Sequence, residues 1–194
     1  EGNTQELSAK NIIVATGAHT AMIPGVKVDG EKILTYQEAI LQTHRPESVI
    51  IIGAGAIGAE FATIWNSYGT KVTLVEMLPR ILPLEDEEIS AELAKEFKKR
   101  GIRMLVGHKV LAVETTDTGV NVKVSDGQNE VVLDAEQALI AIGFKPNTLD
   151  MGLETAGIVL SERGFIQIDN RMATNVPGIW AIGDVTGKLL LAHV

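Results

Sequence analysis

The chain has no cysteine, and this absence excludes disulfide bonds, thiolate metal sites and a cysteine nucleophile within its 194 residues. No apolar run approaches the roughly 18 residues that a membrane-spanning helix needs, so we expect no membrane span. Basic residues are also scarce. The 17 Lys and Arg stand against 25 Asp and Glu, a net charge of −8 that argues against a nucleic-acid-binding surface.

Metal and hydrolase signatures are missing as well. The four histidines lack the spacing of metal ligands, and no Ser/His/Asp constellation is recognisable. The composition, with 45% apolar and 22% charged residues, is that of an ordinary globular protein. No signal peptide is visible in the polar first ten residues, so we expect a cytoplasmic protein, and the missing initiator Met indicates a piece of a longer one.

The stretch from residue 47 to residue 76 has the pattern of a β–α–β unit. Val49–Ile52 is short and β-branched, which predicts a strand buried on both faces. A predicted helix ends at Gly69, and Lys71–Val75 predicts a second strand that closes with Glu76. Between the first strand and the helix, six residues have the G-x-G-x-x-G spacing: Gly53, Ala54, Gly55, Ala56, Ile57 and Gly58.

The predicted helix carries an apolar stripe. Its large side chains recur at helical spacing, so we expect this stripe to lie on the sheet. The residues are Ile57, Phe61, Ile64, Trp65 and Tyr68.

The glycine spacing has a physical meaning in a dinucleotide-binding unit. Gly53 permits the tight turn, Gly55 lets the backbone approach a pyrophosphate, and Gly58 allows close packing of the helix. The helix N-terminus then offers free N–H groups and partial positive charge to phosphates. Glu76 at the end of the second strand can accept both hydroxyls of an adenosine ribose and repels a 2′-phosphate, which favours NAD over NADP. The alternative is a tight strand-to-helix turn without a ligand.

The rest of the chain completes a Rossmann-like α/β fold. After the second strand we expect a helix over Asp86–Arg100 and a third strand over Ile102–Val106. Short valine-rich segments then predict a three-stranded β-meander that serves as the crossover to a buried parallel strand, Ala138–Ile142. The meander strands are expected at Lys109–Thr115, Val120–Ser125 and Glu130–Leu133.

Shorter elements are expected on either side of this region. We predict strands at Asn11–Ala15, Phe165–Asp169 and Gly178–Ile182. A short helix is expected at Tyr36–Leu41, and Lys188–Val194 has the pattern of the start of another helix.

Taken together, these motifs resemble the pyridine-nucleotide–disulfide oxidoreductases, and among them most the dihydrolipoamide dehydrogenases. The order and spacing of the motifs are more specific than any one of them. The resemblance is carried by Ala15-Thr16-Gly17, Gly53 to Glu60, Glu76, Ala141-Ile142-Gly143 with Pro146-Asn147, and Ala181-Ile182-Gly183-Asp184.

The resemblance implies a division by cofactor. Residues 24–143 would form the NAD-binding domain, and residues 1–23 and 144–194 would be remnants of an FAD domain. NAD would contact the glycine loop from Gly53 to Gly58 together with Glu60, Glu76, Val110 and Gly143, with Ile57 near the nicotinamide. FAD would contact Thr16, Gly17, Asp184, Leu190, Leu191, Ala192 and His193.

The resemblance also implies a reaction for the full-length parent. Electrons would pass from dihydrolipoamide through a disulfide and FAD to NAD+, giving lipoamide and NADH. The parent would be a homodimer acting on a lipoamide-bearing protein, whereas this fragment would be inactive alone. Phe144-Lys145 stands where the family usually has arginine. A mercuric, coenzyme A-disulfide or peroxide reductase, and a non-catalytic NAD-binding module, are the alternatives.

Overall fold

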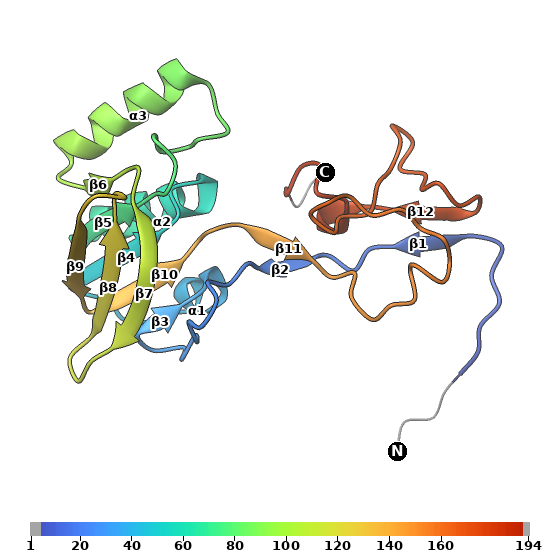
Figure 1. The fold of residues 1–194 in the computed structure, drawn as a ribbon, viewed down its shortest axis with the longest axis horizontal. Helices are drawn as coiled ribbons and strands as arrows, with labels where there is room; N and C mark the ends of the chain where they lie inside the picture. Colours follow the sequence, from blue (N-terminus) through green and yellow to red (C-terminus); the bar gives the residue numbers. More distant parts are fainter. Residues whose placement is uncertain (1–4, 192–194) are drawn as a thin grey trace. The chain divides into compact units, whose positions relative to one another are not determined.

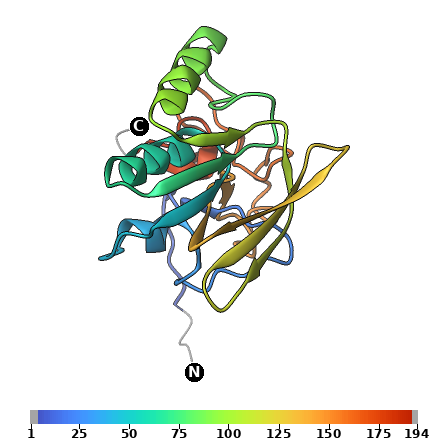
Figure 2. The same ribbon diagram turned by 90° about the vertical axis from the view of Figure 1, so that its left-hand side faces the viewer.

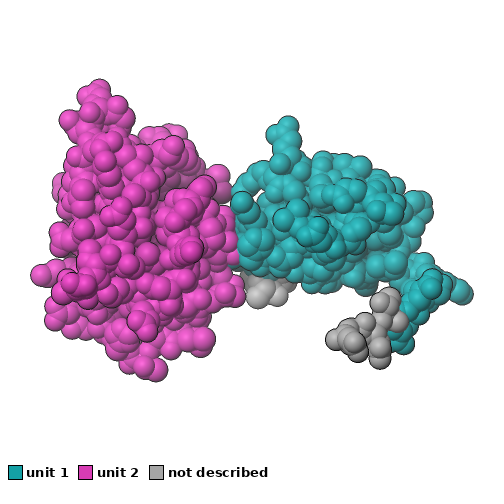
Figure 3. Space-filling model, turned by 60° about the horizontal axis from the view of Figure 1, so that its bottom comes forward, with its two compact units in different colours: residues 1–19, 144–194 teal, residues 20–143 magenta. Residues whose placement is uncertain are grey.

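The structure, a computed structural model, describes residues 5–191 of the chain. It divides into two compact units, which Figure 3 distinguishes by colour. One unit is the continuous segment Thr20–Gly143. The other is built from the two segments that precede and follow it, up to His19 and from Phe144 onward.

A five-stranded parallel sheet forms the centre of the Thr20–Gly143 unit (Figure 1). Its strands pair in a parallel sense throughout. Across the sheet the order is β3 (Ile33–Leu34), β10 (Gln137–Ile140), β4 (Ser48–Ile52), β5 (Lys71–Val75) and β6 (Arg103–Leu105). The expected Rossmann-like α/β fold is confirmed.

Strand β4 is buried on both faces, as its β-branched run predicts. Val49 and Ile51 belong to the core on the helical side of the sheet, and Ile50 and Ile52 belong to the core on the other side. All four side chains are at most 3% exposed. Fully burying one such side chain stabilises a fold by about 1.5–3 kcal/mol, so this strand anchors both cores.

Three helices accompany the sheet: α1 (Tyr36–Ile40), α2 (Ala56–Ser67) and α3 (Glu87–Lys99). The side chain of Asp86 caps α3 by accepting from the N–H groups of Glu88 and Ile89. Gly101 follows that helix at φ +79°, in the left-handed region that ends helices. The helix expected over Asp86–Arg100 is therefore confirmed, with these two residues as its N-cap and C-cap.

The predicted apolar stripe of α2 is wrong in part. Ile64 and Tyr68 are 47% and 70% exposed. Trp65 of the predicted stripe is buried, together with the small residues Gly58, Ala59 and Ala62. The glycine loop brings the start of the helix close to β4, so small side chains face the sheet there, and the large Trp65 is accommodated only in the last turn.

The β-meander is confirmed as an antiparallel sheet of three strands: β7 (Lys109–Thr115), β8 (Val120–Ser125) and β9 (Glu130–Ala135). One face of β8 is buried against the parallel sheet, in the core on the side of the sheet away from α2 and α3. Its residues there are Val120, Val122 and Val124. Figure 2 shows the meander and helices α2 and α3 on opposite faces of that sheet. The meander thus takes the place of a covering helix.

In the second unit, two short parallel strands run side by side, β1 (Ile12–Val14) and β12 (Ile179–Ala181). Strand β2 (Ala18–Thr20) pairs with β11 (Phe144–Pro146), and a 3₁₀ turn over Gly183–Thr186 follows β12. The core of this unit gathers Val14, Leu153, Ile158, Ile166, Ala181 and Val185.

Two expectations for this unit are wrong. Phe165–Asp169 forms no strand, because only Ile166 makes a bridge, to Leu160. Lys188–Leu191 is not helical, and the remaining residues of the expected helix lie outside the described range. Between residues 5 and 191, no helix is long and apolar enough to cross a membrane.

Candidate functional site

Two glycines hold the turn from β4 into α2 where no larger residue fits. Gly53 has φ +101°, and a Cβ there would lie 2.3 Å from the carbonyl oxygen of Ala141 at the end of β10. A Cβ on Gly58 would lie 2.0 Å from the carbonyl oxygen of Gly53. These contacts are with backbone atoms, so the loop requires glycine at both positions.

Gly55 differs from its two neighbours in the motif. A Cβ at this position would meet no atom within 4 Å, and its backbone is extended at φ −73°. Packing therefore does not require glycine here. Gly55 precedes α2 as its N-cap residue, and no side chain caps the helix. The first N–H groups of an α-helix have no acceptor within it, so this turn presents free donors beside an open space.

The Glu76 carboxylate lies next to this turn. Its Oε2 accepts from the N–H of Ala54 at 2.8 Å, and its Oε1 accepts from the N–H of Leu78 at 2.9 Å. Glu76 is 9% exposed. A carboxylate oxygen can accept more than one hydrogen bond, so each oxygen keeps a lone pair for a further donor. The structure thus brings Glu76 and the glycine loop together.

The segment after Glu76 also contacts the glycine loop, which the sequence did not indicate. The N–H of Leu82 donates to the carbonyl oxygen of Ala54 at 2.7 Å. Leu82 has φ +44°, an unusual conformation for a residue other than glycine. Arg80 holds this segment by donating to the carbonyl oxygens of Pro83 and Glu85. The sequence does not predict this contact between Leu82 and Ala54, because leucine is rarely found at positive φ.

The other residues predicted to line an NAD site come from nearby elements. Gly143 follows β10 at φ +107°, in open space. Glu60 is exposed on α2, and Ile57 is half-buried in its first turn. Val110 lies in β7 and is half-buried, packing against the core between the meander and the parallel sheet. It is two residues beyond His108, whose N–H donates to the Glu76 carbonyl oxygen at 2.9 Å.

In the second unit, the residues predicted to contact FAD follow the carboxyl ends of two paired strands. Thr16 and Gly17 come after β1, and Asp184 comes after β12, whose Ala181 is in register with Val14. The Thr16 hydroxyl donates to the carbonyl oxygen of Asn147 at 2.7 Å. Asp184 is half-buried in the 3₁₀ turn.

The remaining predicted FAD contacts are at the end of the chain. Leu190 and Leu191 are 43% and 50% exposed. Ala192 and His193 lie outside the described residues.

Comparison with known proteins decides the family. The whole chain, residues 1–194, matches the family described as "Pyridine nucleotide-disulphide oxidoreductase". The chain belongs to this family. It is 47% identical over 190 residues to dihydrolipoyl dehydrogenase of Mycobacterium leprae, covering 97% of this chain and 40% of that protein. It is 45% identical over 194 residues to dihydrolipoyl dehydrogenase of Mycobacterium tuberculosis, covering all of this chain and 42% of that one.

Solved structures also match the chain. LpdA from Mycobacterium tuberculosis has a TM-score of 0.89 and 37% identity, covering all of this chain and 41% of that one. The HOCl-induced flavoprotein disulfide reductase RclA from Escherichia coli has a TM-score of 0.79 and 31% identity, covering 94% of this chain and 41% of that one. The chain therefore spans about two fifths of the length of these relatives.

The predicted resemblance is confirmed at the level of the family. Among the relatives named above, this member of the family is most similar to the dihydrolipoyl dehydrogenases. The fold matches as well, since the LpdA structure aligns with the full chain.

Proposed function

We propose that the Thr20–Gly143 unit binds NAD and that the chain is the NAD-binding portion of a dihydrolipoamide dehydrogenase. The observation that carries this proposal is the open space at Gly55, where the uncapped start of α2 adjoins the Glu76 carboxylate. A pyrophosphate at this point accepts hydrogen bonds from the first-turn N–H groups and is favoured by the helix dipole.

The site has the form that a dinucleotide requires. Strand β4 lies between β5 and β10, and the chain leaves β4 toward α2 and β5 but returns to the other side of β4 through β10. Ligands of open parallel sheets bind at such a switch point, outside the carboxyl ends of the strands. Gly53 and Gly58 are explained by backbone packing, whereas Gly55 is not. A bound pyrophosphate accounts for the glycine that packing leaves unexplained.

Glu76 supports NAD rather than NADP as the ligand. Each of its oxygens already accepts one backbone N–H and has a lone pair left for a ribose hydroxyl. A 2′-phosphate would instead meet a carboxylate that is held in place by two hydrogen bonds.

We assign residues 1–23 and 144–194 to the FAD domain of the parent. Thr16, Gly17 and Asp184 would hold the flavin from the ends of β1 and β12. In the parent, bound FAD would supply the electron transfer from dihydrolipoamide to NAD+, and the residues of this chain would hold and orient the two cofactors. The parent would be a homodimer, and its partner would be a lipoamide-bearing protein.

A second candidate is another disulfide reductase on the same scaffold. The TM-score of 0.79 to RclA supports it, as does Phe144-Lys145 at a position where arginine is usual. The identities of 45–47% to dihydrolipoyl dehydrogenases favour the first candidate.

Titration of the isolated chain with NADH, followed by the nicotinamide fluorescence, tests the proposal. We expect saturable binding of NADH, no stoichiometric flavin in the purified protein and no lipoamide-dependent oxidation of NADH. Absence of NADH binding to the folded chain would refute the NAD assignment. A yellow protein with one flavin per chain would show that the described FAD contacts suffice on their own.

A further inference from the structure

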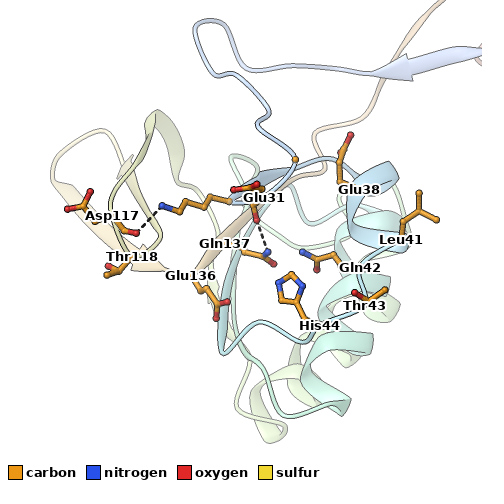
Figure 4. A pocket seen from close by; sticks show the side chains of 12 residues that line it. Glu31, Glu38, Leu41, Gln42, Thr43, His44, Asp117, Thr118, Glu136 and Gln137 are labelled. Atoms are coloured by element: carbon orange, nitrogen blue, oxygen red, sulfur yellow. Dashed lines mark hydrogen bonds between the residues drawn. The ribbon is translucent and has the colours of Figure 1, made fainter.

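A hollow lies at the opposite end of the parallel strands from the glycine loop. It has a volume of about 690 Å³. Its walls come from the turn before β3, from α1 and the segment after it, from the β7–β8 turn and from the start of β10 (Figure 4). Residues 30–32 precede β3, residues 41–44 precede β4 and Glu136 precedes β10, so the hollow is at the amino ends of these strands. The proposed NAD site is at their carboxyl ends.

One wall residue, Gln137, has an acceptor without a partner. The residue is 2% exposed, and its Nε2 donates to the carbonyl oxygen of Glu31 at 2.7 Å. That bond fixes the orientation of the amide. If the amide were turned by about 180°, Oε1 would face the carbonyl oxygen of Glu31, and two acceptors cannot form a hydrogen bond. Its Oε1 is buried and makes no hydrogen bond to any residue in the described range.

Gln42, on the segment after α1, also has a buried Oε1 that makes no hydrogen bond to any described residue. Leaving a buried acceptor unpaired is unfavourable, and native structures contain few such groups. Two of them in the wall of one hollow indicate that a donor is supplied from outside the chain. The hollow's own lysine does not supply it, since the Nζ of Lys32 donates to the carbonyl oxygens of Thr116 at 2.5 Å and Asp117 at 3.1 Å.

The charges around the hollow favour a cation. Glu31, Glu38, Asp117 and Glu136 are in its wall. A hydrogen bond from the side chain of Thr35 lowers the pKa of Glu38, with a further contribution from the Thr35 backbone N–H, so this carboxylate is ionised at neutral pH. Acceptors and negative charges thus outnumber the available donors.

We propose that this hollow binds an organic cation with N–H donors, a guanidinium or primary ammonium group, whose donors pair with Oε1 of Gln137 and Oε1 of Gln42. A metal ion does not fit the site, because no group of three His, Asp or Glu side chains within the described range is placed to hold one. A guanidinium offers several N–H donors in one plane and can pair with an amide oxygen and a carboxylate at once.

The ligand reaches Gln137 through side-chain movement. Figure 4 shows Gln42, His44 and Gln137 pointing toward one another. His44 is exposed and Gln42 is half-buried, both on the irregular segment after α1. Exposed side chains change rotamer in picoseconds to nanoseconds, so His44 moves readily, and a small shift of Gln42 then uncovers the amide oxygen of Gln137.

Binding of agmatine, which has a guanidinium and an ammonium group, tests the proposal with the full 194-residue chain. Butane-1,4-bis(trimethylammonium) is the matched control, because like agmatine it carries two positive charges four methylene groups apart but has no N–H donor. We expect agmatine to shift the side-chain amide NMR signals of Gln137 and Gln42 saturably and this control to bind about tenfold more weakly or worse. Equal binding of the two, or no shift at Gln137, would overturn the proposal.

An acetylated Gly-Arg-Gly peptide distinguishes the source of the cation. Tighter binding of the peptide than of agmatine assigns the hollow to an arginine side chain of a partner protein, and the reverse assigns it to a free small molecule. In either case the N–H donor chemistry is the same.

Gln137→Met and Gln42→Met remove the two acceptors at nearly constant side-chain volume. Each variant should bind agmatine about tenfold more weakly or worse, because hydrogen bonds to charged groups are the strong ones. Gln128→Met, in the exposed turn between β8 and β9, is the control and should bind as the original chain does. If Gln137→Met fails to fold, Gln42→Met decides the test. Unchanged affinity in the folded variants would refute the proposal.

Discussion

The carboxylate of Glu76 and the backbone N–H of Ala54 form a hydrogen bond of 2.8 Å between the end of β5 and the glycine loop after β4. The acid proposed to recognise the ribose is therefore also a structural part of the loop proposed to bind the pyrophosphate. Leu82 donates to the carbonyl oxygen of the same alanine. The Ala54 residue is thus held on both its N–H and its C=O side by the segment that follows β5.

Replacing Glu76 with Ala should weaken NADH binding by about 10- to 100-fold, because hydrogen bonds to a charged group are worth roughly 1.5–3 kcal/mol. NADPH should lose less affinity or gain some, since the substitution also removes a negative charge from the position of the 2′-phosphate. Dissociation constants of both nucleotides, measured at one salt concentration, check this. Glu114→Ala, an exposed position in β7, is the control. A constant NADH-to-NADPH ratio would mean that Glu76 does not face the ribose.

The same substitution should also lower the free energy of unfolding, because the N–H groups of Ala54 and Leu78 lose their acceptor. An unpaired buried polar group costs roughly 1–3 kcal/mol. Glu76→Gln retains one carbonyl oxygen and should be destabilised less than Glu76→Ala. Urea unfolding of the two variants measures the difference. Equal stability of Glu76→Ala and the original chain would show that this carboxylate does not hold the loop.

Gly55 and Gly58 should respond oppositely to a larger side chain. Gly55→Val introduces atoms into open space, so the fold should survive while NADH binding is lost. Gly58→Ala puts a methyl group against the carbonyl of Gly53, and overpacking of this kind costs about 1–3 kcal/mol. Thermal unfolding and NADH titration of both variants separate the effects. Full NADH affinity in Gly55→Val would mean that the loop is only a turn.

Much of the fold could be predicted because local signals and packing agree. The run Val49–Ile52 is too β-branched for a helix and lies in β4, which has a parallel neighbour on both sides and a core on each face. The helix at Glu87–Lys99 has an acidic first turn, a basic last turn and a glycine after it. Such termini can be recognised without knowledge of the tertiary structure.

The failures have a common cause in tertiary contacts. Hydrophobic spacing placed Ile64 and Tyr68 on the sheet, but the close approach of α2 to β4 selects small residues for that face. Phe165–Asp169 alternates like a strand, yet its backbone donors and acceptors pair with irregular segments, as in the bond from the N–H of Ile166 to the carbonyl of Val185. Leu82 at positive φ depends on its contact with Ala54, which no local pattern encodes.

The cap of α3 offers a test of the helical layer. Asp86→Ala removes the acceptor for the N–H groups of Glu88 and Ile89 and should lower the free energy of unfolding by about 1 kcal/mol. Asp86→Asn keeps an oxygen acceptor and loses only the charge, so it should recover most of that stability. Urea unfolding at neutral pH compares the three proteins. Equal losses in both variants would assign the effect to charge at the helix terminus rather than to the cap.

Glu38 should make the stability of α1 depend on pH. Its Oε2 accepts from the hydroxyl of Thr35 at 2.5 Å and from the N–H of Thr35 at 2.8 Å, which completes the capping box of this helix. These bonds, the one from the hydroxyl first, lower the pKa of Glu38 in the folded chain. A lowered pKa stabilises the fold in full above the pKa of an unfolded glutamate, about 4.3. That stability is lost as the pH falls through the lower folded value.

Comparison with Glu38→Gln isolates this contribution, because the amide cannot ionise. The original chain should be the more stable of the two at pH 7, and the difference should be nearly unchanged down to about pH 5. It should then shrink between about pH 4 and the lower folded pKa of Glu38, because protonation removes the charged acceptor from the original chain alone. Urea unfolding of both proteins across this range measures the effect. A difference that stays constant with pH would show that the carboxylate charge does not strengthen the cap.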